Sequence, residues 1–163
     1  MNRRATLKGR LCEDRSLKRR GITTWRIRRR VLVIKLLLAD DKPDMLAALA
    51  QLLQGEFLIV GALSSGASVL AQVDTLNPDI ILLDVSLGDL SGFQVAERLR
   101  QLTCPSKIVF LSIHENPEFL QAAVDVGASG YVFKSQISRD LLHALQSVAM
   151  GIQFFSESEN LTC

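Results

Sequence analysis

Residues 35–44 read KLLLADDKPD. The apolar run Leu36–Ala39 is suited to a buried strand, and two carboxylates, Asp40 and Asp41, follow it directly. Two like charges about 4 Å apart repel by roughly 4 kcal/mol at an effective dielectric of about 20. A fold that holds both carboxylates beside a hydrophobic core therefore needs a cation at that point. This stretch predicts a strand that ends at a cation-binding site.

The same alternation of a short apolar run and a helical pattern continues to residue 150. It predicts strands at 33–39, 57–63, 79–84, 107–112 and 130–134, and helices at 43–54, 66–76, 91–102, 116–127 and 138–150. Five such units predict an α/β fold, a parallel sheet with helices on both faces. Right-handed crossovers and the chain length favour a flavodoxin-like, doubly wound, five-stranded sheet with strand order 2-1-3-4-5.

Several helices carry recognisable start signals. Proline is tolerated in the first turn of a helix, and Ser and Asn are good N-cap residues. We therefore expect Pro43 and Pro117 in first turns, and Ser91, Asn116 and Ser138 as N-caps.

The charge is unevenly distributed along the 163 residues. Residues 1–35 hold 13 Lys/Arg against two acidic residues, whereas residues 36–163 hold six against 15, so a basic arm precedes an acidic globule. We expect residues 1–32 to be a disordered arm, 33–155 one domain and 156–163 a tail or linker start. The arm has two readings without a function: a disordered extension, or upstream codons translated from a misassigned start. The functional alternative is a tether that binds nucleic acid or an anionic membrane.

Targeting and redox signals are weak. No stretch approaches the roughly 20 apolar residues of a membrane helix, and no separate apolar segment follows the arginines as an export signal requires. The three cysteines, Cys12, Cys104 and Cys163, show neither a disulfide framework nor metal-ligand spacing. We expect a cytoplasmic protein without membrane contact.

Acidic residues end the two strands that flank the predicted switch point. In sheets of this type, ligands bind beyond the carboxyl ends of the strands where the strand order reverses, here between the first and third strands. Asp40 and Asp41 follow the first of these strands and Asp84 ends the third, in PDIILLD. Three converging carboxylates suit a hard divalent cation, above all Mg²⁺, which keeps waters and is shared with phosphate.

Two further polar residues end the remaining strands. Ser112 follows the fourth strand and Lys134 the fifth, so both are expected at the same edge of the sheet. Together with Mg²⁺ they could hold the three equatorial oxygens of a phosphoryl group, whose transfer depends mainly on positioning and charge neutralisation. Asp84, alone at the end of the central strand, is the best candidate for a nucleophile that would form an acyl phosphate.

With these residues in place, the sequence resembles the receiver domain of bacterial two-component response regulators, a CheY-like family. The resemblance covers residues 34–155 and is carried by LLLADDKPDML, PDIILLDVSLGDLSGFQV, KIVFLSIHENPE and GASGYVFK. These motifs are most similar to those of the NarL-type subfamily, whose receivers usually precede a helix-turn-helix output domain.

The resemblance implies a role for each matching residue. Asp84 resembles the phosphoacceptor, Asp41 the direct Mg²⁺ ligand, and Asp40 a ligand that acts partly through water. Ser86 resembles the residue that offers a backbone carbonyl to the metal. The switch and phosphate-contacting residues of the family correspond to Ser112, Tyr131 and Lys134.

Two departures from the family pattern stand out. Gly88 occupies a position that is usually proline, and we expect it to loosen the turn without removing a ligand. The chain also ends at Cys163, without room for a helix-turn-helix domain of roughly 60 residues, the usual size in the family that it resembles. A natural single-domain receiver, a frame-shifted remnant and a fragment all fit this length.

The function implied is phosphorelay signalling. A sensor histidine kinase would phosphorylate Asp84, and the face made by the fourth helix, fifth strand and fifth helix would change shape. A homodimer through that face, or through the first and fifth helices, fits the family. We expect no enzymatic activity on a separate substrate and no specific DNA binding by this chain alone.

Three other functions fit parts of the same pattern. Asp-nucleophile phosphatases of the haloacid dehalogenase type place D-x-D after the first strand, where this chain has Asp40, Asp41 and Lys42. A flavodoxin-like FMN binder would need a phosphate loop there, and the acidic DDKPD would repel the phosphate. A degenerate receiver that acts as a phosphorylation-independent binding module is the third.

Overall fold

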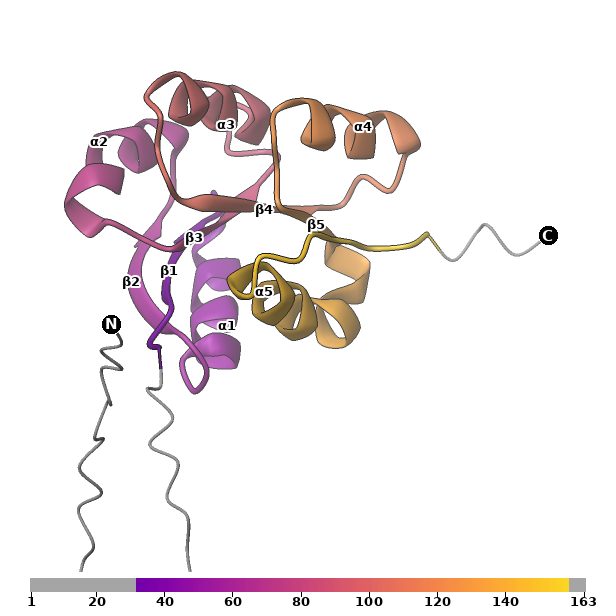
Figure 1. Cartoon of the computed structure of the whole chain (residues 1–163), viewed down its shortest axis with the longest axis horizontal. Helices are drawn as coiled ribbons and strands as arrows, with labels where there is room; N and C mark the ends of the chain where they lie inside the picture. Colours follow the sequence, from indigo (N-terminus) through magenta and orange to yellow (C-terminus); the bar gives the residue numbers. More distant parts are fainter. Residues whose placement is uncertain (1–31, 159–163) are drawn as a thin grey trace, which may run out of the picture. The chain divides into compact units, whose positions relative to one another are not determined.

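Six parallel strands form one sheet in the computed structural model, which describes residues 32–158 (Figure 1). The strand order is β2-β1-β3-β4-β5-β6, so the predicted order of the first five strands is confirmed. A sixth strand of two residues was not predicted. The strands are β1 (Lys35–Ala39), β2 (Leu58–Leu63), β3 (Ile80–Asp84), β4 (Lys107–Ser112), β5 (Gly130–Phe133) and β6 (Phe154–Phe155).

Five α-helices cover the two faces of this sheet in the described part of the chain. They are α1 (Pro43–Leu53), α2 (Gly66–Leu76), α3 (Gly92–Gln101), α4 (Pro117–Asp125) and α5 (Leu142–Ala149). Helices α1 and α5 lie on one face, and α2, α3 and α4 on the other (Figure 1). In β1, Leu36 and Leu38 face the first pair while Leu37 and Ala39 face the second group. Both faces of the strand are buried, which explains its continuous apolar run.

Four of the five residues expected at helix starts lie at the expected positions. Pro43 and Pro117 lie in first turns. The Ser91 hydroxyl caps α3 by accepting a hydrogen bond from Gln94 N. In return, Ser91 N donates a hydrogen bond to Gln94 Oε1, which completes a capping box. Asn116 stands at the N-cap position of α4 but makes no side-chain capping bond.

The prediction that Ser138 is an N-cap is wrong. The chain enters a 3₁₀ turn, Lys134–Gln136, directly after β5 and continues through a π-helical turn, Ile137–Leu141, into α5. Ser138 lies inside this helical segment and is exposed. Because helical structure begins immediately at the end of the strand, the orphan N–H groups of a helix start lie before Ser138 rather than after it.

The segment after α5 docks on the edge of the sheet. Phe154 and Phe155 pair with Gly130 and Tyr131 of β5. The next residue, Ser156, is only 4% exposed. Its N–H donates to Tyr131 O at 2.8 Å, and its hydroxyl donates to Asp140 Oδ2 at 2.7 Å. The ordered segment therefore extends past Phe155 into residues that the sequence assigned to a tail.

Some expectations fall outside the described residues. The basic arm, apart from Leu32, and residues 159–163 are among them, as are Cys12 and Cys163. Within residues 32–158, no helix is long and apolar enough to cross a membrane.

We predict that Ser156→Ala loosens β6. The variant loses the hydrogen bond to the buried Asp140 carboxylate, so the free energy of unfolding should fall by about 1–2 kcal/mol. Amide hydrogen exchange at Phe154 and Ser156 should accelerate more than exchange in β1, and urea unfolding gives the stability. Ser158→Ala, two residues further on, is the control and should change neither quantity. Equal behaviour of the two variants would show that the Asp140 contact does not hold β6.

Candidate functional site

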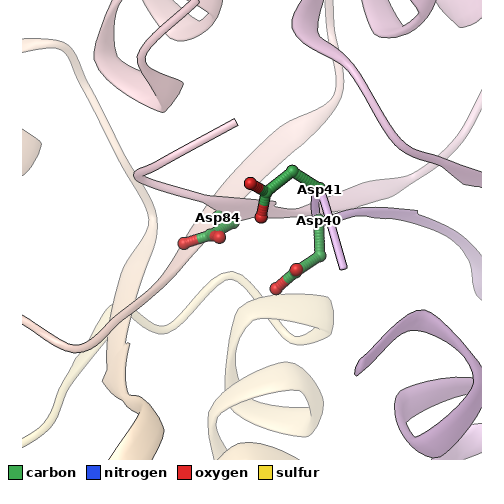
Figure 2. A group of neighbouring side chains, drawn as sticks. All are labelled: Asp40, Asp41 and Asp84. Carbon is green, nitrogen blue, oxygen red and sulfur yellow. The ribbon is translucent and has the colours of Figure 1, made fainter. Parts of the chain in front are cut away.

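Three carboxylates meet where β1 and β3 end. One oxygen from each of Asp40, Asp41 and Asp84 lies within 4.8 Å of the others, and Figure 2 shows the Asp41 side chain pointing toward Asp84. Asp40 is 0% exposed and Asp84 is 4% exposed, whereas Asp41 faces solvent. The parallel register of β1 and β3 brings these strand ends together although the residues are far apart in sequence. The predicted cluster is therefore present.

One ammonium group bridges the two buried carboxylates. Lys134 Nζ lies 2.8 Å from Asp40 Oδ2 and 3.1 Å from Asp84 Oδ2. Its side chain is 10% exposed, so both ion pairs are shielded from water. Lys134 opens the 3₁₀ turn that follows β5, and this position at the strand end lets its side chain reach past the end of β4 to the ends of β3 and β1.

Burial and charge act in opposite directions on this trio. Burial raises the pKa of Asp84 above the ordinary aspartate value of 3.8, against the lowering effects of Lys134 and of the Ser86 N–H. Burial would lower the pKa of Lys134, but the hydrogen bonds and charges of Asp40 and Asp84 outweigh it and raise that pKa. The site therefore destabilises the charged form of Asp84 and stabilises the charged form of Lys134.

The cluster still carries an excess of negative charge. Lys134 compensates only one of three carboxylates, and Asp41 has no hydrogen bond or ion pair with any other residue between 32 and 158. Ser86 N donates to Asp84 Oδ1 at 3.2 Å, which brings the Ser86 backbone to the same pocket. An all-oxygen donor set with an exposed carboxylate fits a hard divalent cation.

Ser112 and Tyr131 are linked through the backbone of His114. His114 N donates to Ser112 Oγ at 3.0 Å, and Tyr131 Oη donates to His114 O at 2.8 Å. Tyr131 is 0% exposed and packs in the hydrophobic core between the sheet and α2, α3 and α4. Burial raises the pKa of its hydroxyl, with a smaller opposing effect of Ser112. The two predicted switch residues thus form one hydrogen-bonded unit.

The loop after Asp84 makes a tight turn at Gly88. Gly88 has a φ of +80°, which favours glycine and which proline cannot adopt. Asp89 N donates to Leu87 O at 2.9 Å and closes a γ-turn around Gly88. At the other end of the loop, a Cβ on Gly92 would lie 2.4 Å from the Asp84 carbonyl oxygen, so only glycine fits there.

Two residues of this region were not recognised from the sequence. His114 acts through its main chain, which leaves no signal in residue type. Asp89 accepts hydrogen bonds from the first turn of α2, and the long separation along the chain hides this contact. Six of the seven predicted site residues nevertheless lie at the carboxyl edge of the sheet. Tyr131 lies within β5, and its hydroxyl reaches His114 O beyond the end of β4. The individual roles of all seven remain predictions.

Comparison with known proteins agrees with this arrangement. The family pattern described as the response regulator receiver domain matches residues 36–146. The chain is 32% identical over 125 residues to the nitrate/nitrite response regulator protein NarL of Escherichia coli (strain K12), covering 76% of this chain and 58% of that protein. It is 36% identical to the positive alginate biosynthesis regulatory protein of Pseudomonas aeruginosa, covering 71% of this chain and 47% of that protein. The chain thus spans less than two thirds of these curated relatives.

Solved structures give the same fold. The isolated REC domain of RcsB from Salmonella enterica serovar Typhimurium, in the presence of phosphomimetic BeF3⁻, has a TM-score of 0.72 and 24% identity, covering 77% of this chain and 94% of that one. A two-component response regulator of the LuxR family from Aurantimonas sp. SI85-9A1 has a TM-score of 0.72 and 23% identity, covering 75% and 89%. At these identities the likeness concerns the fold alone.

We predict that Lys134→Met strongly destabilises the metal-free protein. The substitution leaves two buried carboxylates without their shared cation, and breaking a buried ion pair by removing one partner costs on the order of 3 kcal/mol. Urea unfolding in the presence of a chelator measures the loss. Lys42→Met, which removes an exposed lysine beside the acidic pair, should cost far less. Similar stability of both variants would mean that Lys134 does not hold the carboxylates together.

A second prediction concerns pH. Because the folded-state pKa of Asp84 is raised, the folded protein binds this proton more tightly than the unfolded chain does, and stability is lost as pH rises above about 3.8 through the folded pKa. Asp84→Asn removes this loss, so the stability of the variant relative to wild type should increase with pH and then level off. Chelator-treated samples unfolded in urea across this range test it. Asp74→Asn controls for loss of an exposed carboxylate, and a difference independent of pH would contradict the prediction.

Proposed function

We infer that this chain, which belongs to the response regulator receiver domain family, is a phosphorylation-dependent switch in two-component signalling with Asp84 as its phosphoacceptor. The observation that carries the proposal is the cluster of Asp40, Asp41 and Asp84 bridged on its buried side by Lys134. Asp40 and Asp84 share the Lys134 ammonium at the switch point of the sheet. Asp41 is exposed to solvent and can bind a second cation.

In the proposed reaction, an Asp84 carboxylate oxygen attacks the phosphorus of the donor. A P–O bond to Asp84 forms, and the donor bond, P–N in a phosphohistidine, breaks with its electron pair on the nitrogen, which takes up a proton. Lys134, already 3.1 Å from Asp84 Oδ2, lies where it can pair with the added phosphoryl charge. Shielding of this ion pair from water makes its interaction with the incoming anion stronger than at the surface.

The residues present fit Mg²⁺ as the cofactor of this step. Asp41 and Asp84 would hold it directly, Asp40 through water, and Ser86 through its backbone carbonyl. When bound, the ion supplies positive charge that offsets the carboxylates and the phosphoryl oxygens. Asp41 is available for this role because Lys134 is engaged with the other two carboxylates.

The proposed response to phosphorylation uses the unit of Ser112, His114 and Tyr131. Tyr131 is already fully buried and hydrogen-bonded to His114 O, so inward movement of the ring is not required to reach this state. We propose that a phosphoryl group that engages Ser112 raises the population of this arrangement rather than creating it. The change would reach the face formed by α4, β5 and α5, where β6 is paired with Tyr131.

The proposed donor is a sensor histidine kinase, which the receiver would meet in the cytoplasm. A homodimer through the α4–β5–α5 or the α1–α5 face is part of the proposal, and we do not propose catalysis on a separate substrate. The comparisons support neither the phosphatase alternative nor a phosphorylation-independent binding module.

We predict that the full chain gains one phosphoryl group when incubated with acetyl phosphate and Mg²⁺, seen by intact mass as an acid-stable, alkali-labile adduct. Asp84→Asn should abolish the adduct, because the proposed attacking carboxylate is Asp84, which ends the central strand β3 and pairs with Lys134. Asp74→Asn should label as wild type does. Undiminished labelling of the Asp84 variant would overturn the acceptor assignment, and a folded wild type that never labels would favour the binding-module alternative.

A further inference from the structure

Asp89 connects the loop after the phosphoacceptor to a different helix. Its Oδ1 accepts a hydrogen bond from Gly66 N at 2.9 Å, and its Oδ2 accepts one from Ala67 N at 3.0 Å. Gly66 and Ala67 open α2, where N–H groups have no partner within the helix. The carboxylate therefore fastens the tip of the loop to α2 at two points.

The loop is thereby fixed at both ends. At its base, Gly92 N donates to Val85 O at 2.7 Å, and Ser86 pairs with Ser91 in an isolated antiparallel bridge. At its tip, the γ-turn at Gly88 directs the next side chain toward α2. A loop with a fixed base and a fixed tip has few remaining conformations, because its short backbone cannot move between them.

This loop forms part of the wall of the proposed metal site. Ser86 N donates to Asp84 Oδ1 at 3.2 Å, and the Ser86 carbonyl is a proposed ligand. A Cβ at Gly88 would lie 3.9 Å from Asp41 Oδ2, so the turn passes beside the exposed carboxylate. The position of the loop therefore sets where the Ser86 carbonyl stands relative to Asp41 and Asp84.

We propose, on the basis of the function proposed above for this site, that Asp89 is a positioning residue for Mg²⁺. By tying the loop to α2 it holds the Ser86 carbonyl in place before the ion arrives, so binding does not have to order the loop. Partners that orient metal ligands without touching the metal commonly change affinity by about 10–100-fold when removed. Asp89 acts in this indirect way, since its own oxygens are engaged with α2.

Ser65 distinguishes this role from simple helix capping. Its Oγ accepts a hydrogen bond from Ser68 N at 3.1 Å, at the same start of α2, and is also hydrogen-bonded to the Ser68 hydroxyl. Ser65→Ala weakens the helix start without releasing the loop. Asp89→Ala weakens the same helix start and releases the loop as well. The difference between the two variants isolates the contribution of the tether.

The test uses the full chain without a phosphodonor. Mg²⁺ alone is titrated into wild type, Asp89→Ala and Ser65→Ala by calorimetry, and amide exchange of residues 85–91 is measured in chelator. We expect Asp89→Ala to raise the Mg²⁺ dissociation constant about tenfold and to accelerate exchange in the loop. Ser65→Ala should leave the dissociation constant within about twofold of wild type and accelerate exchange only near the start of α2.

The possible outcomes separate this proposal from the one on which it rests. Wild type that binds Mg²⁺, together with equal dissociation constants for the two variants, would make Asp89 a helix cap and overturn the inference alone. Wild type that does not bind Mg²⁺ would overturn the proposed metal site and the positioning role with it. Asp89→Asn retains one acceptor oxygen, so it replaces Asp89→Ala if that variant does not fold, and an intermediate affinity would support the tether.

Discussion

Two carboxylates that end neighbouring parallel strands are buried together, and one ammonium group makes this arrangement stable. Asp40 and Asp84 lie at adjacent positions because β1 and β3 run side by side, and both are almost completely buried. Lys134 comes from the far side of the sheet, after β5, and contacts both. The pocket thus requires that β1, β3 and β5 end at the same edge of the sheet. The parallel register of the strands brings these ends together.

Most of this arrangement could be predicted from the sequence because it follows from strand ends. A polar residue directly after an apolar run must lie at the sheet edge, and parallel strands put all such edges together. Asp40, Asp84, Ser112 and Lys134 were located by that rule alone. The same rule cannot describe what happens beyond the strand end, where side-chain contacts rather than periodicity determine the path of the chain.

The features that sequence reasoning missed share this origin. The start of the last helix was misplaced to Ser138 because 3₁₀ and π-helical turns have no hydrophobic period of their own. Strand β6 contains two residues, too few for an alternation pattern, and depends on Ser156 and the distant Asp140. The contact of Asp89 with α2 was missed because the partners are more than 20 residues apart in the sequence.

The charge of the pocket links the proposed metal ion to the proposed phosphoryl group. Asp40, Asp41 and Asp84 against Lys134 leave two excess negative charges, which one divalent cation would cancel. Phosphorylation would replace the single charge of Asp84 by a dianion and so return only about one negative charge to the pocket. Without the cation, the dianion would be added to a pocket that is already doubly negative and partly shielded from water, where repulsion is strong. In the proposed mechanism the cation therefore binds before the phosphoryl group arrives, and a loop fastened at its base and at its tip would already hold the Ser86 carbonyl in place for it.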